Sequence, residues 1–84
     1  MRLVFSEHAW EDYLHWQAKD KKILHRINAL IKDIERSPFK GIGKPEALRH
    51  GLSGYWSRRI TNEHRIVYKV QDEAIFIVQL RYHY

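Results

Sequence analysis

The chain contains no cysteine among its 84 residues, so it can form no disulfide bond and no thiolate metal site. Packing alone must stabilise the fold, and nothing points to an oxidising compartment. No apolar run approaches the roughly 20 residues that span a membrane. The apolar start Leu3-Val4-Phe5 is too short for the core of a signal peptide, and Glu7 follows it closely. We therefore expect a cytoplasmic protein that does not enter a membrane.

Two further patterns of catalytic proteins are missing. The six histidines show no close pairing of the kind that binds zinc, and no serine lies in a nucleophile-elbow motif. The sequence therefore predicts neither a metal site nor a serine triad, and no cofactor is expected.

The positive charge is concentrated in the second half of the chain. Residues 40–84 carry eight Lys and Arg against four Asp and Glu, whereas residues 1–39 carry seven against six, and the net charge is +5. A basic surface attracts polyanions, so RNA or DNA is the first class of partner to test. A positive net charge is also common in proteins without such a partner. The length allows one small core, and we treat residues 1–84 as a single domain.

Hydrophobic spacing predicts a short strand over residues 2–5 and two helices over residues 7–18 and 21–36. Ser6 and Asp20 are suitable N-caps, and Ser37-Pro38 ends the second helix. The short gap between the helices predicts an antiparallel helical hairpin. The expected apolar face of the first helix consists of Ala9, Trp10, Tyr13, Leu14 and Gln17.

Residues 55–83 contain three β-type runs separated by two polar breaks, which is the pattern of an antiparallel meander. The chain is therefore predicted to be an α+β fold, with the hairpin packed on one face of a twisted antiparallel sheet. Alternation places Arg65 on the exposed face and predicts one apolar row, Phe76 to Tyr82, in the last strand. The residues expected in the core are Ile27, Leu30, Ile31, Ile34, Ile66, Tyr68, Val78 and Leu80.

Three polar residues of the basic half could carry chemistry. His83 is a natural general acid or base near neutral pH, although an exposed histidine without a function is the plainer interpretation. Arg65 lies within a strand and is suited to clamp a phosphate, but arginines are frequent on solvated sheet faces. Glu46 could be a general base, and the sequence alone favours a loop glutamate paired with Lys44 or Arg49.

Aromatic residues of the same half could stack on unpaired RNA bases. The candidates are Tyr55, Trp56, Tyr82 and Tyr84. For Trp56 and Tyr82, the strand faces favour a place in the core over stacking on RNA.

Four segments together resemble the YoeB-type toxins of the RelE/ParE superfamily. They are SEHAWEDYLHW, FKGIGKPEALRH, GLSGYWSRRITNEHRIVY and the closing RYHY, and the resemblance covers the whole chain. It implies a RelE/ParE-like fold and a messenger RNA endonuclease that cuts the codon in the ribosomal A site. It also implies a YefM-like antitoxin as partner, and toxin dimers.

The resemblance assigns roles to particular residues. Glu46 in KPEAL would be the general base, Arg65 in HRIVY would hold the scissile phosphate, and His83 and Tyr84 would complete the catalytic set. The expected RNA-binding cations are Lys44, Arg49, Arg59 and Arg81. The family commonly has lysine where this chain has Arg49, so a forked cation replaces a point charge there.

Two other functions stay open at this stage. One is a ParE-like inhibitor of gyrase without its own catalysis, and the other is a non-catalytic RNA-binding module, since one fold can serve all three. RNA cleavage through its 2′-hydroxyl needs a base, a cation for the phosphorane charge and an acid for the leaving oxygen. Glu46, Arg65 and His83 match these roles without a metal, which favours the nuclease.

Overall fold

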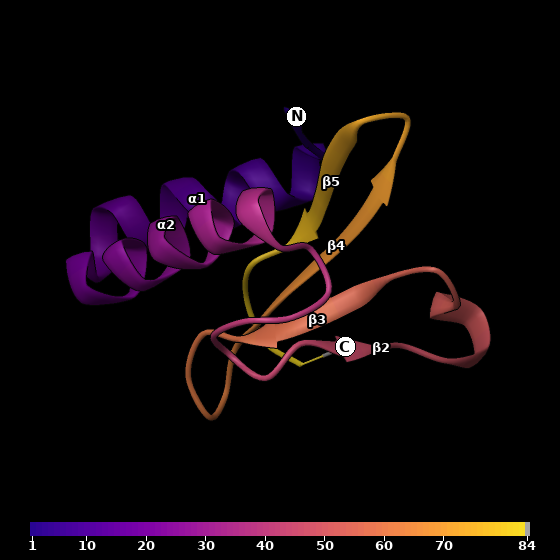
Figure 1. The fold of residues 1–84 in the computed structure, drawn as a ribbon. Helices are drawn as coiled ribbons and strands as arrows, with labels where there is room; N and C mark the ends of the chain where they lie inside the picture. Colours follow the sequence, from indigo (N-terminus) through magenta and orange to yellow (C-terminus); the bar gives the residue numbers. More distant parts are fainter. Residues whose placement is uncertain (84) are drawn as a thin grey trace.

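The computed structural model describes residues 1–83 and contains two helices and a five-stranded sheet (Figure 1). The helices are α1 (Glu7–Lys19) and α2 (Lys21–Arg36). The strands are β1 (Arg2–Phe5), β2 (Glu46–Ala47), β3 (Trp56–Arg59), β4 (Arg65–Gln71) and β5 (Ala74–Gln79), and a 3-10 helix, His50–Leu52, follows β2. The predicted α+β fold class is confirmed. No helix within residues 1–83 is long and apolar enough to cross a membrane.

The sheet has the order β1-β5-β4-β3-β2. Strands β3, β4 and β5 form the predicted antiparallel meander, and β2 pairs antiparallel with β3. Strand β1 instead runs parallel to β5, with Arg2 opposite Ala74, so the sheet is mixed. A parallel pair needs a long crossover connection, and here the whole chain between β1 and β5, including both helices, provides it.

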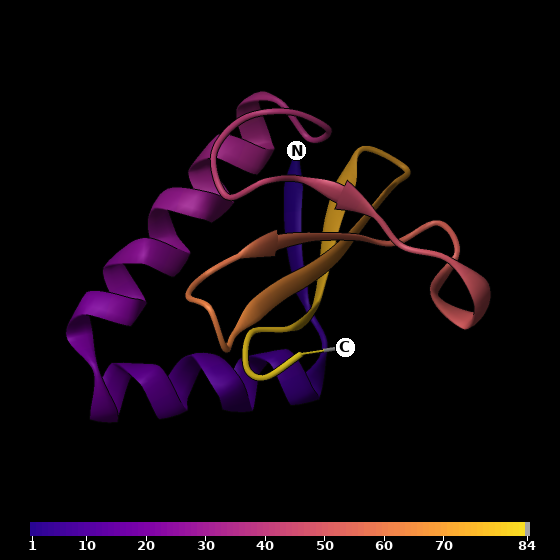
Figure 2. The same ribbon diagram turned by 90° about the horizontal axis from the view of Figure 1, so that it is seen from below.

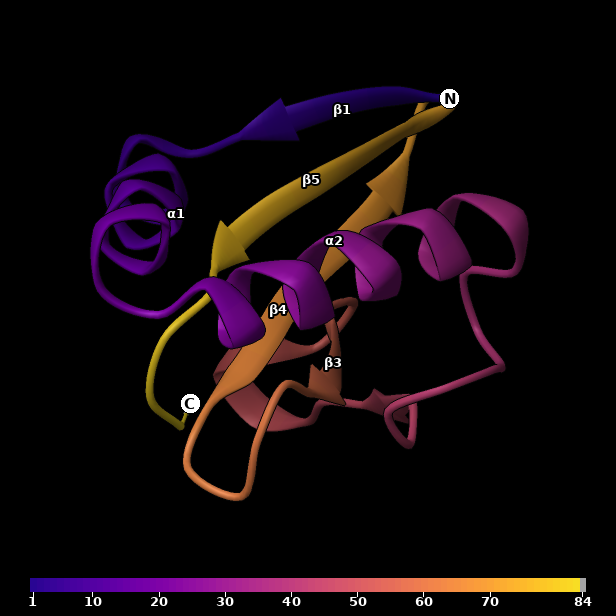
Figure 3. The same cartoon turned by 90° about the vertical axis from the view of Figure 1, so that its left-hand side faces the viewer.

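Asp20 joins the two helices. Its backbone N–H donates to the Trp16 carbonyl at the end of α1, and its carboxylate accepts the N–H groups of Lys22 and Ile23 at 3.0 and 3.2 Å. Such side-chain caps satisfy the free N–H groups of a first helical turn. The helices therefore form the predicted hairpin, and Figures 2 and 3 show them diverging from this junction.

Helix α2 supplies most of the helical side of the core. Figure 3 shows it crossing in front of the sheet, and its stripe of Ile27, Leu30, Ile31 and Ile34 is buried. These side chains share one core cluster with residues of β4 and β5. Seven of the expected core residues are confirmed as buried: Ile27, Leu30, Ile31, Ile34, Ile66, Tyr68 and Leu80. Val78 is only half-buried, so its assignment was wrong.

The row predicted for the last strand fails because of a β-bulge. Tyr68 pairs with Ile77 while Val67 pairs with Gln79, which leaves Val78 as an extra residue. An extra residue shifts the alternation of a strand by one position. Ile75 and Ile77 therefore face the core before the bulge, and Leu80 returns to the core after it.

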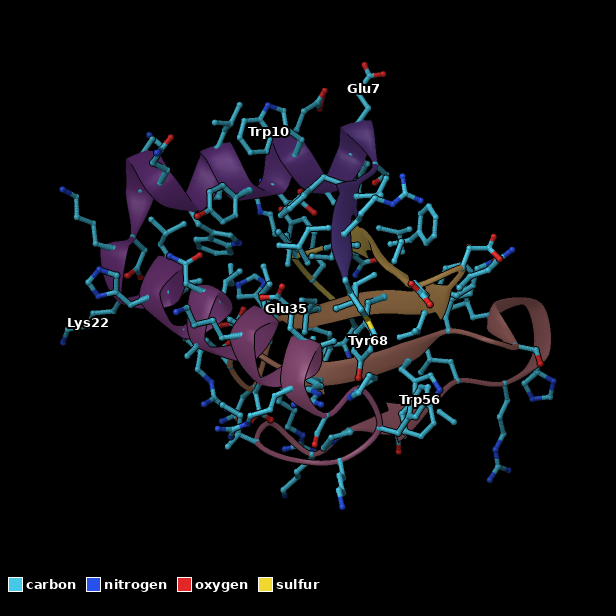
Figure 4. The ribbon with its side chains drawn as sticks, turned by 45° about the horizontal axis from the view of Figure 1, so that its top comes forward. Glu7, Trp10, Lys22, Glu35, Trp56 and Tyr68 are labelled. Atoms are coloured by element: carbon cyan, nitrogen blue, oxygen red, sulfur yellow. The ribbon has the colours of Figure 1, made fainter. Side chains whose placement is uncertain are left out.

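The buried face of α1 also differs from the prediction. Trp10 and Leu14 are 48% and 41% exposed, whereas Asp12 and Trp16 are buried, and Figure 4 labels Trp10 on this helix. Asp12 accepts the Leu80 N–H at 3.0 Å, and the Trp16 indole donates to the Leu80 carbonyl at 2.8 Å. Hydrogen bonding makes the burial of Asp12 tolerable. These two contacts attach the end of the sheet to α1.

Candidate active site on the open face of the sheet

The face of the sheet turned away from the helices carries a basic cluster. Strand alternation puts Ser57, Arg59 and Arg65 on this face, because their neighbours Arg58 and Ile66 face the core. Arg59 lies directly opposite Arg65, and Glu46 lies directly opposite Ser57. Side chains opposite each other in a sheet lie about 5 Å apart at Cβ, so these residues are neighbours.

These residues surround one cavity of about 190 Å³, lined by Lys44, Glu46, Ser57, Arg59 and Arg65. Three cationic side chains and one carboxylate therefore meet in a space that could take a phosphate group with a base beside it. Four of the residues predicted from the sequence for RNA chemistry are thus brought together. Within residues 1–83, no three His, Cys, Asp or Glu side chains are placed to hold a metal ion.

Arg65 is buried, with 7% of its surface exposed, and the expectation of an exposed side chain was wrong. Its face was assigned correctly, but the turn between β3 and β4 folds over it. Nη1 of Arg65 donates to the carbonyls of Thr61, Asn62 and His64 at 2.8, 3.2 and 3.1 Å. These bonds fix the guanidinium in place, and the carbonyls carry no charge that would neutralise it.

The segment after β5 brings His83 to the same turn. The predicted strand to His83 is wrong, because β5 ends at Gln79 and Tyr82 adopts a positive φ of 66°. Figures 1 and 2 show the tail bending back beside the start of β4. Nε2 of His83 lies 3.3 Å from the Asn62 carbonyl oxygen, which also accepts from Arg65. Tyr84, the other predicted terminal residue, lies outside the described residues.

The two remaining predicted cations lie elsewhere. The Arg81 guanidinium lies over the rings of Trp16 and Tyr82, 5.9 and 4.6 Å from their centroids, on the side of α1. Arg49 is exposed and lines a neighbouring hollow that it shares with Glu46 and His50. The structure therefore places Arg49 beside the cavity and Arg81 away from it.

The loop that carries Lys44 and leads to Glu46 is held by Arg58, to which the sequence analysis assigned no role. Arg58 is fully buried, and its Nη1 contacts the Asp33 carboxylate of α2 at 2.6 Å. Its two Nη atoms also donate to the carbonyls of Ser37, Lys40 and Ile42. The hydrogen bond from Arg58 holds the pKa of Asp33 below its usual value.

Two further contacts bind this loop to the sheet. The Tyr68 hydroxyl donates to the Pro38 carbonyl, and burial raises the Tyr68 pKa; Figure 4 shows this side chain near the end of α2. The Arg59 N–H donates to the Gly43 carbonyl at 2.7 Å. Gly43 has a φ of 80°, and a Cβ there would lie 2.7 Å from Leu30. An arginine at a core-facing strand position was the signal for this network, because a buried cation needs partners.

Several known proteins are similar to this chain in both sequence and fold. The family model described as a YoeB-like toxin of bacterial type II toxin-antitoxin systems matches residues 5–84. Toxin YoeB of Escherichia coli K12 is 60% identical over 84 residues and covers all of both chains.

Among solved structures, a YoeB/ParE toxin from Agrobacterium tumefaciens is 46% identical, covers 100% of both chains and superposes with a TM-score of 0.98. YoeB of Staphylococcus aureus, solved as a dimer, is 49% identical and covers 100% of this chain and 98% of that one with a TM-score of 0.93. The same protein in a heterotetrameric complex with YefM has the same identity and coverages, and a TM-score of 0.92.

Proposed function

Because the chain belongs to the YoeB-like toxin family of bacterial type II toxin-antitoxin systems, we propose that it is a ribosome-dependent endoribonuclease. It enters the ribosomal A site in the cytoplasm, cuts the messenger RNA bound there, and so inhibits translation. The observation that carries the proposal is the cavity in which Glu46 lies among Lys44, Arg59 and Arg65. A site for a polyanion with a single carboxylate inside it suits phosphodiester cleavage better than binding alone.

The reaction needs a base that starts it. The 2′-hydroxyl of the nucleotide before the cut is the nucleophile, and Glu46 takes its proton as the oxygen attacks the neighbouring phosphorus. Glu46 is exposed on the short strand β2, so an RNA strand lying across the open face can reach it. The upstream product then ends in a 2′,3′-cyclic phosphate.

The pentavalent phosphorane carries extra negative charge, which preorganised cations stabilise. Arg65 is the best-placed group, because three backbone carbonyls hold its guanidinium before substrate arrives. Lys44 and Arg59 are exposed at the same cavity and contact the flanking phosphates. Arg49, beside the cavity, continues this cationic path.

The leaving 5′-oxygen needs a proton, and His83 provides it. The Asn62 carbonyl lies within reach of both Arg65 and His83, which supports a shared site for cation and acid. Tyr84 completes the catalytic set, as the family resemblance implies. Each chemical role is filled by a side chain, so we propose that the reaction is metal-independent.

The direct test is cleavage of messenger RNA on purified ribosomes, with and without a chelator. We expect one cut in the A-site codon that is insensitive to the chelator, and no cut without ribosomes. His83→Ala, or deletion of His83 and Tyr84, should bind ribosomes and lose most of the cleavage. A wild-type chain that leaves the RNA intact and inhibits gyrase supercoiling would support the ParE-like alternative instead.

The partner that neutralises this site is proposed to be a YefM-like antitoxin. The Staphylococcus aureus relative is known in a complex with YefM, which supports the same pairing here. An acidic, initially disordered segment would be drawn to the cavity cations. We expect it to cover or displace residues 81–84. Equal chemical protection of the tail with and without antitoxin would contradict this.

Dimers are a second proposed assembly. Leu3 and Trp10 are 41% and 48% exposed, and both line an apolar hollow with Phe5 and Tyr13. The dimer of the Staphylococcus aureus relative supports a second copy as the partner for this surface. Sedimentation of Trp10→Glu at several concentrations should show loss of the dimer.

A further inference from the structure

The tail after β5 is held by side-chain hydrogen bonds and by one backbone hydrogen bond to the start of β4. The Gln79 amide donates to the carbonyls of Arg81, Tyr82 and His83 at 2.8, 3.2 and 3.0 Å. On its other side, the tail meets the start of β4 through two hydrogen bonds of Tyr82. The Arg65 N–H donates to the Tyr82 carbonyl at 3.0 Å, and the Tyr82 N–H donates to Nδ1 of His64 at 2.8 Å.

The contact with His64 decides which form its imidazole takes. Since Nδ1 accepts the Tyr82 N–H, it carries no proton, and the proton of the neutral ring lies on Nε2. The ring packs edge-on against Trp16, with the centroids 4.8 Å apart, and lies 5.8 Å from the Tyr82 ring. His64 is half-buried, so packing and hydrogen bonding both fix its orientation.

We propose that His64 is a positioning residue that holds the tail so that His83 reaches the scissile bond. The inference rests on the proposed function, in which His83 is the acid. Tyr82 directly precedes His83, so its N–H bond to His64 sets where the next residue leaves the turn. His83 in turn contacts Asn62, two residues before His64 in the same turn. The imidazole thus ties the acid to the segment that fixes Arg65.

The same geometry makes the attachment sensitive to acid. A protonated imidazole carries N–H groups on both nitrogens and cannot accept the Tyr82 N–H. The phenol of Tyr82 faces His64 directly. Beside the two rings that pack on His64 lie His15 of α1, in contact with Trp16, and Arg81 of the tail, over Trp16 and Tyr82. On its own segment, His64 is flanked by Glu63 and Arg65. Protonation of His64 therefore loosens the tail without removing the acid.

Asparagine gives a sharp test of this role. Its Oδ1 is separated from Cα by the same number of bonds as Nδ1 of histidine. This oxygen accepts a hydrogen bond and is not protonated at the pH values at which histidines titrate. His64→Asn should keep the tail in place at every pH, whereas His64→Ala removes the acceptor. His25→Ala serves as the matched control, because His25 is exposed on α2.

The experiment compares these variants by single-turnover cleavage on ribosomes from about pH 8 to pH 5, the range in which histidines usually titrate. His64→Ala should cut about 10²-fold more slowly than wild type, the cost of a small misplacement of a reacting group. His64→Asn should recover most of that loss and fall less steeply than wild type on acidification. His25→Ala should follow the wild type.

Hydrogen exchange of the Tyr82 amide supplies a readout that does not depend on catalysis. We expect protection in wild type and His64→Asn, and fast exchange in His64→Ala, with melting temperatures measured in parallel. Unchanged cleavage and unchanged Tyr82 exchange in His64→Ala would overturn the inference. Equal loss of cleavage in the Asn and Ala variants would overturn it too.

Failure of the proposed function has a different signature. A wild type that never cuts RNA, with Tyr82 still protected through His64, refutes the nuclease and keeps the attachment of the tail. If His64→Ala does not fold, the Asn variant decides by its pH profile. An acid dependence identical to that of wild type would then refute the role of His64.

Discussion

Two arginines on neighbouring strands of one sheet are held in opposite ways. Arg58 faces the helices, is fully buried, and pairs with the Asp33 carboxylate at 2.6 Å. Arg65 faces away from them, and among residues 1–83 its fixed contacts are neutral carbonyls, with no ion pair. Asp33 compensates the charge of Arg58, whereas the charge of Arg65 is held rigidly and left available to an anion. The difference separates a structural cation from the one that we propose to be catalytic.

The largest effect on stability is expected from removing Arg58. Arg58→Ala should lower the free energy of unfolding by about 3–5 kcal/mol, because a buried pair is left with one partner and the loop carbonyls lose their donor. Urea denaturation measures this loss. Arg36→Ala is the matched control, since Arg36 also contacts Asp33 but is exposed, and it should change stability by less than about 0.5 kcal/mol. Similar losses in both variants would contradict the structural role of Arg58.

Removing Arg65 should affect chemistry more than stability. Arg65→Ala should slow single-turnover cleavage by about 10²- to 10³-fold, the usual cost of one preorganised charge contact in a transition state. The loss of its bonds to the turn should also destabilise the fold by about 1–3 kcal/mol. Arg65→Lys keeps the charge but lacks the forked guanidinium, so its cleavage rate should lie between those of wild type and Arg65→Ala. Near-normal cleavage by Arg65→Ala would remove its proposed role.

Low pH should affect the contacts of Arg58 but not those of Arg65, because within residues 1–83 only Arg58 of the two pairs with a carboxylate. The ordinary pKa of the Asp33 carboxyl is 3.8, and the hydrogen bond from Arg58 lowers it in the fold. A lowered folded-state pKa stabilises the fold fully above the ordinary value, and this stabilisation is lost as pH falls below it. Asp33→Asn should therefore be less stable at neutral pH and lose stability less steeply below about pH 4.

Urea midpoints at a series of pH values measure this slope. Arg65→Lys, which leaves Asp33 and Arg58 in place, should keep the wild-type acid profile. An Asp33→Asn profile parallel to that of wild type would show that the ion pair with Arg58 does not cause the acid dependence.

The smallest effect is expected at Arg81. Its guanidinium packs on Trp16 and Tyr82, away from the cavity, so Arg81→Ala should lower stability by about 0.5–1 kcal/mol, the scale of an exposed cation–π contact. Cleavage should change little compared with Arg65→Ala. A loss of cleavage as large as that of Arg65→Ala would place Arg81 among the RNA contacts after all.

Short-range patterns made most of the fold predictable. The stripe of α2, the caps at Ser6 and Asp20, and the alternation in β3 and β4 each depend on residues within a few positions of one another. The β5 row was assigned incorrectly because Ile75, Phe76, Ile77 and Val78 are all apolar, so sequence could not reveal the bulge. The burial of Asp12 depends on the Leu80 N–H, far along the chain, and apolar periodicity cannot detect it.

The candidate site also contains residues that the sequence could place and residues that it could not. Arg59 and Arg65 could be placed on one face by alternation, and the structure brings Lys44 and Glu46 to them. The position of His83 could not be predicted, since it depends on the positive φ of Tyr82, on a hydrogen bond that His64 accepts and on one that Gln79 donates. The contact with His64 joins residues that lie far apart in the sequence, so no local pattern reveals it.

On the proposed function, the open face of the sheet cleaves RNA by activating the 2′-hydroxyl of the RNA substrate itself. The most direct measurement uses ribosomes programmed with messenger RNA that carries a single 2′-deoxy nucleotide immediately before the cut. We expect wild type to cut the unmodified RNA to a 2′,3′-cyclic phosphate and to leave the modified RNA intact, while binding both complexes equally. Cleavage of the 2′-deoxy substrate at a comparable rate would contradict the account, because the nucleophile would then have to come from elsewhere.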